Sequence, residues 1–135
     1  NIVGFGEACH IAKNSMQNEA EIISTLRDKM LKTIQELISN SKVNGSLQAR
    51  LPGNLNICFP GINNESLIAA VPEIAISSGA SCTTSSRSAS HVLLALGLSK
   101  NEAFCSLRFG IGRFNSKQEI LTATKIICKF LSGHQ

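Results

Sequence analysis

The chain has 135 residues, of which 43% are hydrophobic and 16% charged, a composition typical of one globular domain and not of a disordered chain. Its formal net charge is only +4, its lysines and arginines are scattered, and Trp and Tyr are absent. These features argue against a nucleic-acid-binding surface. No apolar run reaches the ~18 residues of a membrane span, and no signal peptide is recognised at the start. We therefore expect neither nucleic acid nor membrane as a partner.

The cysteines indicate a reducing compartment. They are odd in number, evenly dispersed and without a C-x-x-C pair: Cys9, Cys58, Cys82, Cys105 and Cys128. This pattern favours an intracellular location, cytoplasmic or, in a eukaryote, an organellar matrix. Cys58, Cys105 and Cys128 lie in apolar runs and are expected to behave as small core residues. Cys9 adjoins His10, but adjacent helical residues point in different directions, so no metal site is expected there.

The first elements along the chain are helical. Gly4 to about Met16 predicts one helix, and a second is expected from Glu19 onward, capped by Asn18. The Asn44-Gly45 pair then marks a turn. The apolar stripe of the second helix has three- and four-residue steps: Ile22, Leu26, Met30, Ile34, Leu37 and Ile38.

Short strands and helices alternate in the middle of the chain. Alternating apolar residues predict a strand over Leu55–Phe59, and a short helix is expected over Asn64–Ala70 with Asn64 as its cap. Ile74–Ser77 is expected to form a second strand. A third short helix is predicted over Ser90–Leu96, with Gly97 just beyond its end.

Two capping boxes of the form S-x-x-E frame the last strand. Ser99–Glu102 and Ser116–Glu119 each predict the start of a helix. Between them, apolar residues over Cys105–Ile111 alternate with Ser106, Arg108 and Gly110, which form a polar face. The final helix has one inner face: Ile120, Leu121, Thr124, Ile127, Cys128 and Leu131. The predicted fold is a single α/β layer of three or four mostly antiparallel strands with helices packed on one face.

Nine of the fourteen residues from Ser77 to Ser90 are Ser or Thr, with Cys82 near the middle. Such a segment buries too little apolar surface to offset its ordering entropy of roughly 1–2 kcal/mol per residue. It could be a surface loop with an incidental thiol, or a tether that lets a thiol react in one place and deliver in another. A phosphatase-like phosphate cradle is disfavoured, because only four residues separate Cys82 from Arg87 and no glycine lies between them.

Two further residues could take part in chemistry. Arg108 lies on the polar face of a strand, where its guanidinium could bind a carboxylate through two parallel hydrogen bonds or pair with a local acid. His91 follows the hydroxyl-rich segment and could tune a thiol or act as an acid or base, although a surface or capping role is the commoner one.

Four segments carry a resemblance to a known family: IVGFGEA, LPGNLNICFPGINNESLI, AISSGASCTTSSRSASHVLLALGL and SLRFGIGRFNSKQEI. In this order and spacing they resemble the C-terminal small domain of a cysteine desulfurase. The similar enzymes are of the long-loop type that feeds iron–sulfur cluster assembly and depends on pyridoxal phosphate. The resemblance covers nearly the whole chain. It implies the small-domain fold of fold-type I pyridoxal-phosphate enzymes, with residues 1–135 forming that single domain.

The resemblance also implies roles for individual residues. Cys82 matches the loop cysteine that attacks the sulfur of L-cysteine, leaving alanine and becoming a persulfide. Arg108 matches the arginine that holds the substrate carboxylate, and His91 is retained as a supporting residue. The implied partners are a large-domain chain or homodimer mate and an iron–sulfur scaffold or other sulfur acceptor, with Cys82 as the point of any transient iron–sulfur contact.

The sequence departs from the family in three places. A lysine in a Ser-Gly-His-Lys setting is absent, as is the longer scaffold-docking tail, and Ser88-Ala89 stands where relatives have Glu-Pro. We therefore expect no pyridoxal phosphate on this chain alone and no desulfurase activity without a cofactor-bearing domain. A non-catalytic persulfide relay or an inactive remnant are the alternatives. Ile2, Val3 and Phe5 are expected to form an exposed apolar patch that promotes self-association.

Overall fold

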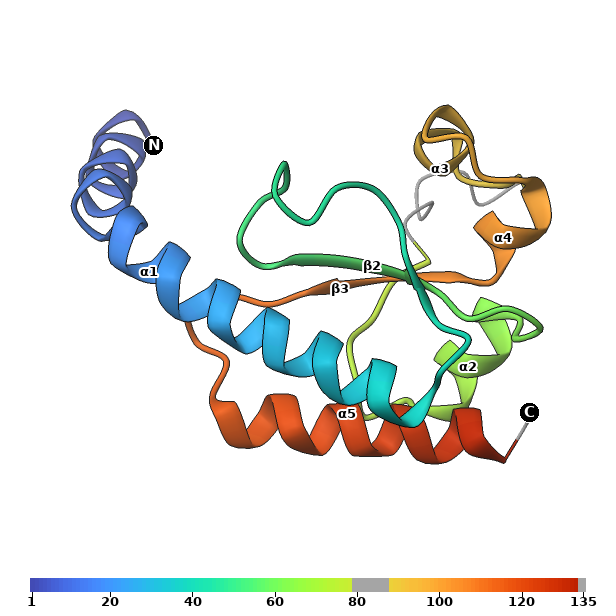
Figure 1. Ribbon diagram of the computed structural model, residues 1–135. Coiled ribbons are helices and arrows are strands. Elements are labelled where there is room, and N and C mark those ends of the chain that lie inside the picture. The colour runs from blue at the N-terminus through green and yellow to red at the C-terminus, as the bar shows by residue number, and fades with distance from the viewer. Residues whose placement is uncertain (79–87, 134–135) are drawn as a thin grey trace.

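The computed structural model describes residues 1–78 and 88–133 (Figure 1). Cys82 and Arg87 therefore lie outside the described residues. The helices are α1 (Ile2–Leu37), α2 (Asn64–Ala70), α3 (His91–Ala95), α4 (Lys100–Phe104) and α5 (Lys117–Ser132). The strands are β1 (Lys42–Val43), β2 (Asn54–Cys58) and β3 (Ser106–Gly110).

The three strands form one antiparallel sheet in the order β1-β2-β3. The register places Leu55 opposite Phe109 and Asn56 opposite Arg108. Ser77 joins the free edge of β3 through an isolated bridge to Arg108. The predicted strand over Ile74–Ser77 is therefore wrong in extent, because only its last residue pairs. The expectation of a small, mostly antiparallel sheet of three or four strands is confirmed.

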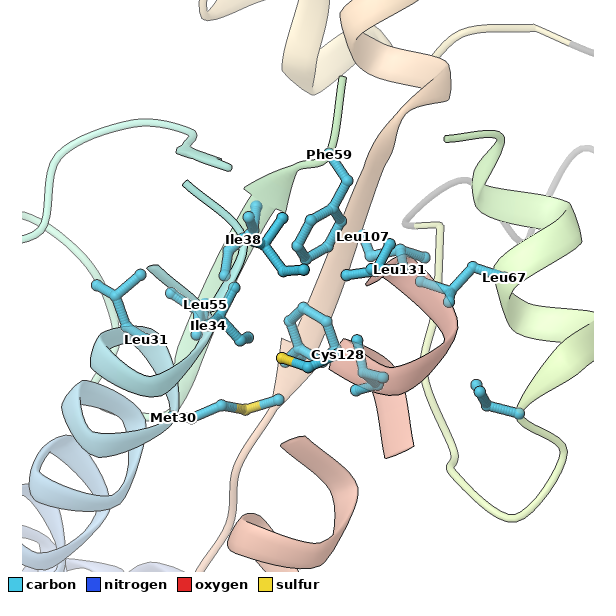
Figure 2. Packing of buried hydrophobic residues seen from close by; sticks show 14 of the residues in the cluster. Met30, Leu31, Ile34, Ile38, Leu55, Phe59, Leu67, Leu107, Cys128 and Leu131 are labelled. Atoms are coloured by element: carbon cyan, nitrogen blue, oxygen red, sulfur yellow. The ribbon is translucent and has the colours of Figure 1, made fainter. Parts of the chain in front are cut away.

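One face of the sheet carries the hydrophobic core. Alternation along β2 and β3 directs Leu55, Ile57, Leu107 and Phe109 to this face, and each is at most 3% exposed. The C-terminal part of α1 and the whole of α5 run below the sheet in Figure 1 and cover this face. Figure 2 shows side chains from both helices converging on those of the strands. The two long helices cover only this face; polar residues occupy the other face, and the short helix α3 lies beside them.

The first helix differs from the prediction. Residues 2–37 form one continuous helix, so Asn18 lies inside it and is not a cap. No proline interrupts this stretch, and an asparagine within a helix costs only a few tenths of a kcal/mol, which is too little to end it. Ile22 and Leu37 are 54% and 55% exposed, because the core meets only part of the predicted stripe.

The helix caps follow the sequence signals closely. Both predicted capping boxes are present, at Ser99 and Ser116. Asn63, and not Asn64, caps α2, because the Asn63 side chain accepts hydrogen bonds from two backbone N–H groups of that helix. Gly97 has φ +89° after α3, a left-handed conformation that glycine adopts without strain.

The exposure of the first apolar residues of α1 and the burial of two of three cysteines match the predictions. Ile2, Val3 and Phe5 are 90%, 86% and 73% exposed, so the apolar patch is confirmed, while self-association stays a prediction for sedimentation velocity to test. Cys58 and Cys128 are buried, whereas Cys105 is only half-buried.

Across residues 1–78 and 88–133, no cluster of metal-ligating side chains and no helix suited to spanning a membrane is found.

Candidate functional site

The polar face of the sheet forms the floor of a cavity that contains Arg108. Its volume is about 260 Å³, slightly below the roughly 300–1,000 Å³ of pockets for drug-sized ligands, which suits a ligand the size of a free amino acid. Its walls are formed by the loop that follows β1, by α3, and by Ser78 and Ser90. The lining residues are Asn44, Gly45, Ser46, Ala49, Arg50, Asn54, Asn56, Ser78, Ser90, Val92, Leu93, Leu96 and Arg108.

Arg108 is positioned by its backbone and leaves its guanidinium available. Its N–H donates to the Ser77 carbonyl at 2.8 Å, and its carbonyl accepts from the Ser77 N–H at 3.4 Å. The Arg108 side chain is exposed and makes no hydrogen bond or ion pair with another described residue. The pairing with a local acid that the sequence left open is therefore not found in the described part of the chain. A fork of free N–H donors in a cavity suits a carboxylate.

Arg50 contributes charge to the same cavity but has a structural task. Its Nε donates to the Ser46 carbonyl at 2.6 Å, its Nη2 to the Asn44 carbonyl at 2.7 Å and its Nη1 to the Asn54 carbonyl at 3.5 Å. Partial burial, and then the charge of Arg27, lower the pKa of Arg50, yet arginine remains protonated at neutral pH. Arg50 therefore fixes the loop while making the cavity electropositive.

A polar network beneath the cavity links three elements. The Asn44 amide nitrogen donates to Asn56 Oδ1 at 2.6 Å and to Ser106 Oγ at 2.9 Å, and Ser106 Oγ donates to the Glu102 carbonyl at 2.6 Å. Asn44 is 7% exposed and Ser106 fully buried. Because buried polar groups need partners, this network ties the loop after β1 to β2 and β3.

The structure places the three sequence-predicted site residues differently. Arg108 lines the cavity, whereas His91, exposed in the first turn of α3, is not among the lining residues. Cys82 lies outside the described residues, but Ser78 and Ser90, on either side of its segment, both line the Arg108 cavity. The cavity is thus adjacent to both ends of the chain segment that carries the predicted nucleophile.

Two other cavities in the described part of the chain are larger and less suited to an anion. One, of about 570 Å³, includes Arg27, which is already paired with Asp28 at 2.7 Å. The other, of about 550 Å³, is lined mainly by apolar residues and contains Glu73 and Glu119 but no arginine. Of these three cavities, only the smaller one contains a guanidinium that has no partner among the described residues, so size does not decide the choice.

The sequence prediction missed Arg50, Asn44 and Asn56. The Asn44-Gly45 pair indicated only a turn, and Arg50 was grouped with the scattered charges. Asn56 does alternate with buried residues of its strand, which is a signal for a polar face. Its place beside Arg108 depends on cross-strand register, which one sequence does not specify.

Fold and cavity together define an α/β domain with an exposed arginine, Arg108, in a cavity on the polar face of its sheet. The family model of aminotransferase class-V matches residues 1–122. The chain therefore belongs to the aminotransferase class-V family.

The chain is similar in sequence to proteins that are named cysteine desulfurases. The chain is 47% identical over 127 residues to a protein from Dictyostelium discoideum named probable cysteine desulfurase, mitochondrial, covering 94% of this chain and 28% of that protein. It is 44% identical over 127 residues to cysteine desulfurase IscS of Rickettsia bellii, covering 94% of this chain and 31% of that protein. The chain thus spans less than a third of the length of these two curated relatives.

A solved structure supports the fold. A NifS-like protein superimposes with a TM-score of 0.81 at 25% identity, over 98% of this chain and 33% of that one. The small α/β fold with a three-stranded antiparallel sheet is therefore shared with a structure that is about three times as long.

The residues that line the cavity do not match the needs of pyridoxal phosphate, the cofactor that the family implies. Enzymes of this kind hold it through a lysine Schiff base and place an acidic or arginine partner at the pyridinium nitrogen. Among the described residues that line the Arg108 cavity there is no lysine and no acidic residue, and the second arginine, Arg50, is hydrogen-bonded to backbone carbonyls. The cavity therefore does not fit the cofactor, whereas it does fit a carboxylate.

Proposed function

We propose that this chain is the small C-terminal domain of a cysteine desulfurase, in which Arg108 binds the carboxylate of L-cysteine and Cys82 accepts its sulfur. The observation that carries the proposal is the unpaired Arg108 guanidinium in an electropositive cavity of amino-acid size. The identity of 44–47% to cysteine desulfurases supports the choice of substrate.

The net reaction converts two thiols into one persulfide and alanine. The Cys82 sulfur bonds to the substrate sulfur, and the substrate Cβ–S bond breaks with its electron pair left on Cβ. Cβ then takes up one of the two thiol protons, which makes alanine, and the other proton stays with the persulfide. Cys82 retains the transferred sulfur as a persulfide for a scaffold or another acceptor. Ser78 lines the cavity, and four residues of chain span at most about 14 Å, so covalent connectivity keeps Cys82 within that distance of the rim.

The same proposal includes a limit on the isolated chain. Because the cavity does not fit pyridoxal phosphate, we propose that the 135-residue chain makes no alanine by itself and works with a cofactor-bearing domain. Alanine formation from L-cysteine by the purified chain with added pyridoxal phosphate, above the rate with the free cofactor, would contradict this part.

The activity test uses a chimaera in which this chain replaces the matching segment of the Rickettsia bellii relative. Arg108→Ala is expected to lower kcat/KM for L-cysteine by roughly 10²–10⁴-fold, the value of two hydrogen bonds to a charged group. Arg108→Lys keeps the charge but loses the fork, so an intermediate loss is expected. Cys82→Ser is expected to reduce alanine formation to background.

Matched controls are available for both residues. Arg113 pairs with Glu19 at 3.1 Å outside the cavity, and Arg113→Ala should leave kcat/KM within about twofold. Cys105→Ser should do the same. If Arg108→Ala behaves like Arg113→Ala, the assignment of the carboxylate site is wrong. If the chimaera takes sulfur on Cys82 from an intact desulfurase but makes no alanine, a relay role replaces the enzymatic one.

A further inference from the structure

The orientation of the Asn56 amide follows from the hydrogen bonds beneath the cavity. Ser106 Oγ has a single proton, which it donates to the Glu102 carbonyl. It must therefore accept from Asn44, so the Asn44 atom in contact with it is the amide nitrogen. That nitrogen also contacts the Asn56 side chain, and the Asn56 atom concerned must be the acceptor Oδ1.

This orientation leaves the Asn56 Nδ2 group free to bind a ligand. Both protons of the Asn44 amide are used, and no described residue accepts a hydrogen bond from Asn56 Nδ2. Asn56 is half-buried and lines the cavity. A partly buried amide that lacks a partner at two of its donor positions is a ready site for an acceptor ligand.

Asn56 and Arg108 are direct cross-strand neighbours in the sheet. The Arg108 backbone N–H and carbonyl turn outward to Ser77, so the Asn56–Arg108 pair is of the non-hydrogen-bonded kind, in which side chains lie closest. Both side chains are on the polar face, and no described residue accepts a hydrogen bond from the Asn56 Nδ2 group or from the Arg108 guanidinium. The same small volume therefore holds an amide donor and a guanidinium fork.

We propose that Asn56 is a second carboxylate-binding residue, whose Nδ2 group donates to one oxygen of the amino-acid carboxylate that Arg108 pairs with. The proposal rests on the proposed function, because it concerns the same site. The buried Asn44–Ser106 network holds the amide in the donating orientation before the ligand arrives. Two converging donors select a planar carboxylate over a neutral ester or amide.

The test is an NMR titration of the ¹⁵N-labelled 135-residue chain with L-cysteine under reducing conditions. L-Cysteine is expected to shift the Asn56 side-chain amide signal saturably, whereas L-cysteine methyl ester, which has no carboxylate, is not. Asn56→Ala should weaken L-cysteine binding roughly tenfold, the effect of losing one hydrogen bond to a charged group. Asn56→Asp, which places a negative charge there, should abolish binding.

Asn54 provides the matched control. It lies on the same strand and face, lines the same cavity, and is opposite Gly110 instead of Arg108. Asn54→Ala should weaken L-cysteine binding clearly less than Asn56→Ala does, and amide spectra of every variant should remain those of the folded chain.

The outcomes separate this inference from the proposed function. If Arg108→Ala abolishes L-cysteine binding while Asn56→Ala matches Asn54→Ala, the role of Asn56 is wrong and that of Arg108 stands. If neither Arg108→Ala nor Asn56→Ala changes the affinity, or the wild-type chain shows no saturable shift, both assignments are overturned.

Discussion

Replacing Gly53 with alanine should sharply destabilise the sheet that supports the cavity. A Cβ at Gly53 would lie 1.9 Å from the Ile111 carbonyl oxygen and 2.9 Å from Ile23 Cγ2. Ordinary contact would require the two backbones to separate by about 1.5 Å. The Gly53 carbonyl also accepts the Ile111 N–H at 2.9 Å, and this bond would be lost.

The cost combines two terms. Overpacking of this kind costs about 1–3 kcal/mol and the lost hydrogen bond about 1 kcal/mol, so Gly53→Ala should lower the free energy of unfolding by about 2–4 kcal/mol. Domains of this size are stable by only about 5–15 kcal/mol. Urea denaturation followed by far-UV circular dichroism is the suitable assay, because the chain has no Trp or Tyr.

Gly112→Ala is the matched control for Gly53→Ala. Gly112 adjoins Ile111, its Cβ would meet nothing within 4 Å, and its φ is not positive. This variant should unfold within about 0.5 kcal/mol of the wild-type chain. If Gly53→Ala proves as stable as Gly112→Ala, the close approach of the chain before β2 to the chain after β3 is wrong.

Two further predictions concern thiols and helix capping. Burial raises the pKa of the Cys58 and Cys128 thiols. Iodoacetamide at pH 8 should therefore modify the exposed Cys9 much faster than either buried thiol. Equal modification rates for the three cysteines, measured by peptide mass spectrometry, would refute the burial of Cys58 and Cys128. Hydrogen bonds from the Ser116 backbone and side chain lower the pKa of Glu119. The capping box therefore stabilises the folded state fully at pH values above the unfolded glutamate pKa of about 4.3. This stabilisation is lost as the pH falls through the lower pKa that Glu119 has in the folded state. Ser116→Ala should therefore reduce the urea midpoint more at pH 7 than at pH 3, and a pH-independent difference would contradict this.

Local signals in the sequence predicted local structure well. The two S-x-x-E boxes begin helices because side chains and backbone of the same four residues satisfy each other. Alternation in β2 and β3 correctly separated a core face from a polar face. These features depend on neighbours in sequence, which a single chain displays directly.

The failures concern choices that tertiary contacts decide. Asn18 has the residue type of a helix cap, but nothing in its surroundings ends the helix. Asn63 and Asn64 are equally good caps by type, and Asn64 instead donates to the Ser106 carbonyl at 3.1 Å. Asn56 could not be recognised as a neighbour of Arg108 without the register of two strands about fifty residues apart in the chain.

We propose that Cys82 takes sulfur from a substrate held by Arg108, and the mass of the Cys82 peptide decides whether it does. The chimaera is incubated with sulfur-labelled L-cysteine, trapped with an alkylating reagent and digested. We expect one labelled sulfur on Cys82 in the wild-type chimaera and none in its Arg108→Ala variant. Label on another cysteine, or equal label on Cys82 in both proteins, would contradict it.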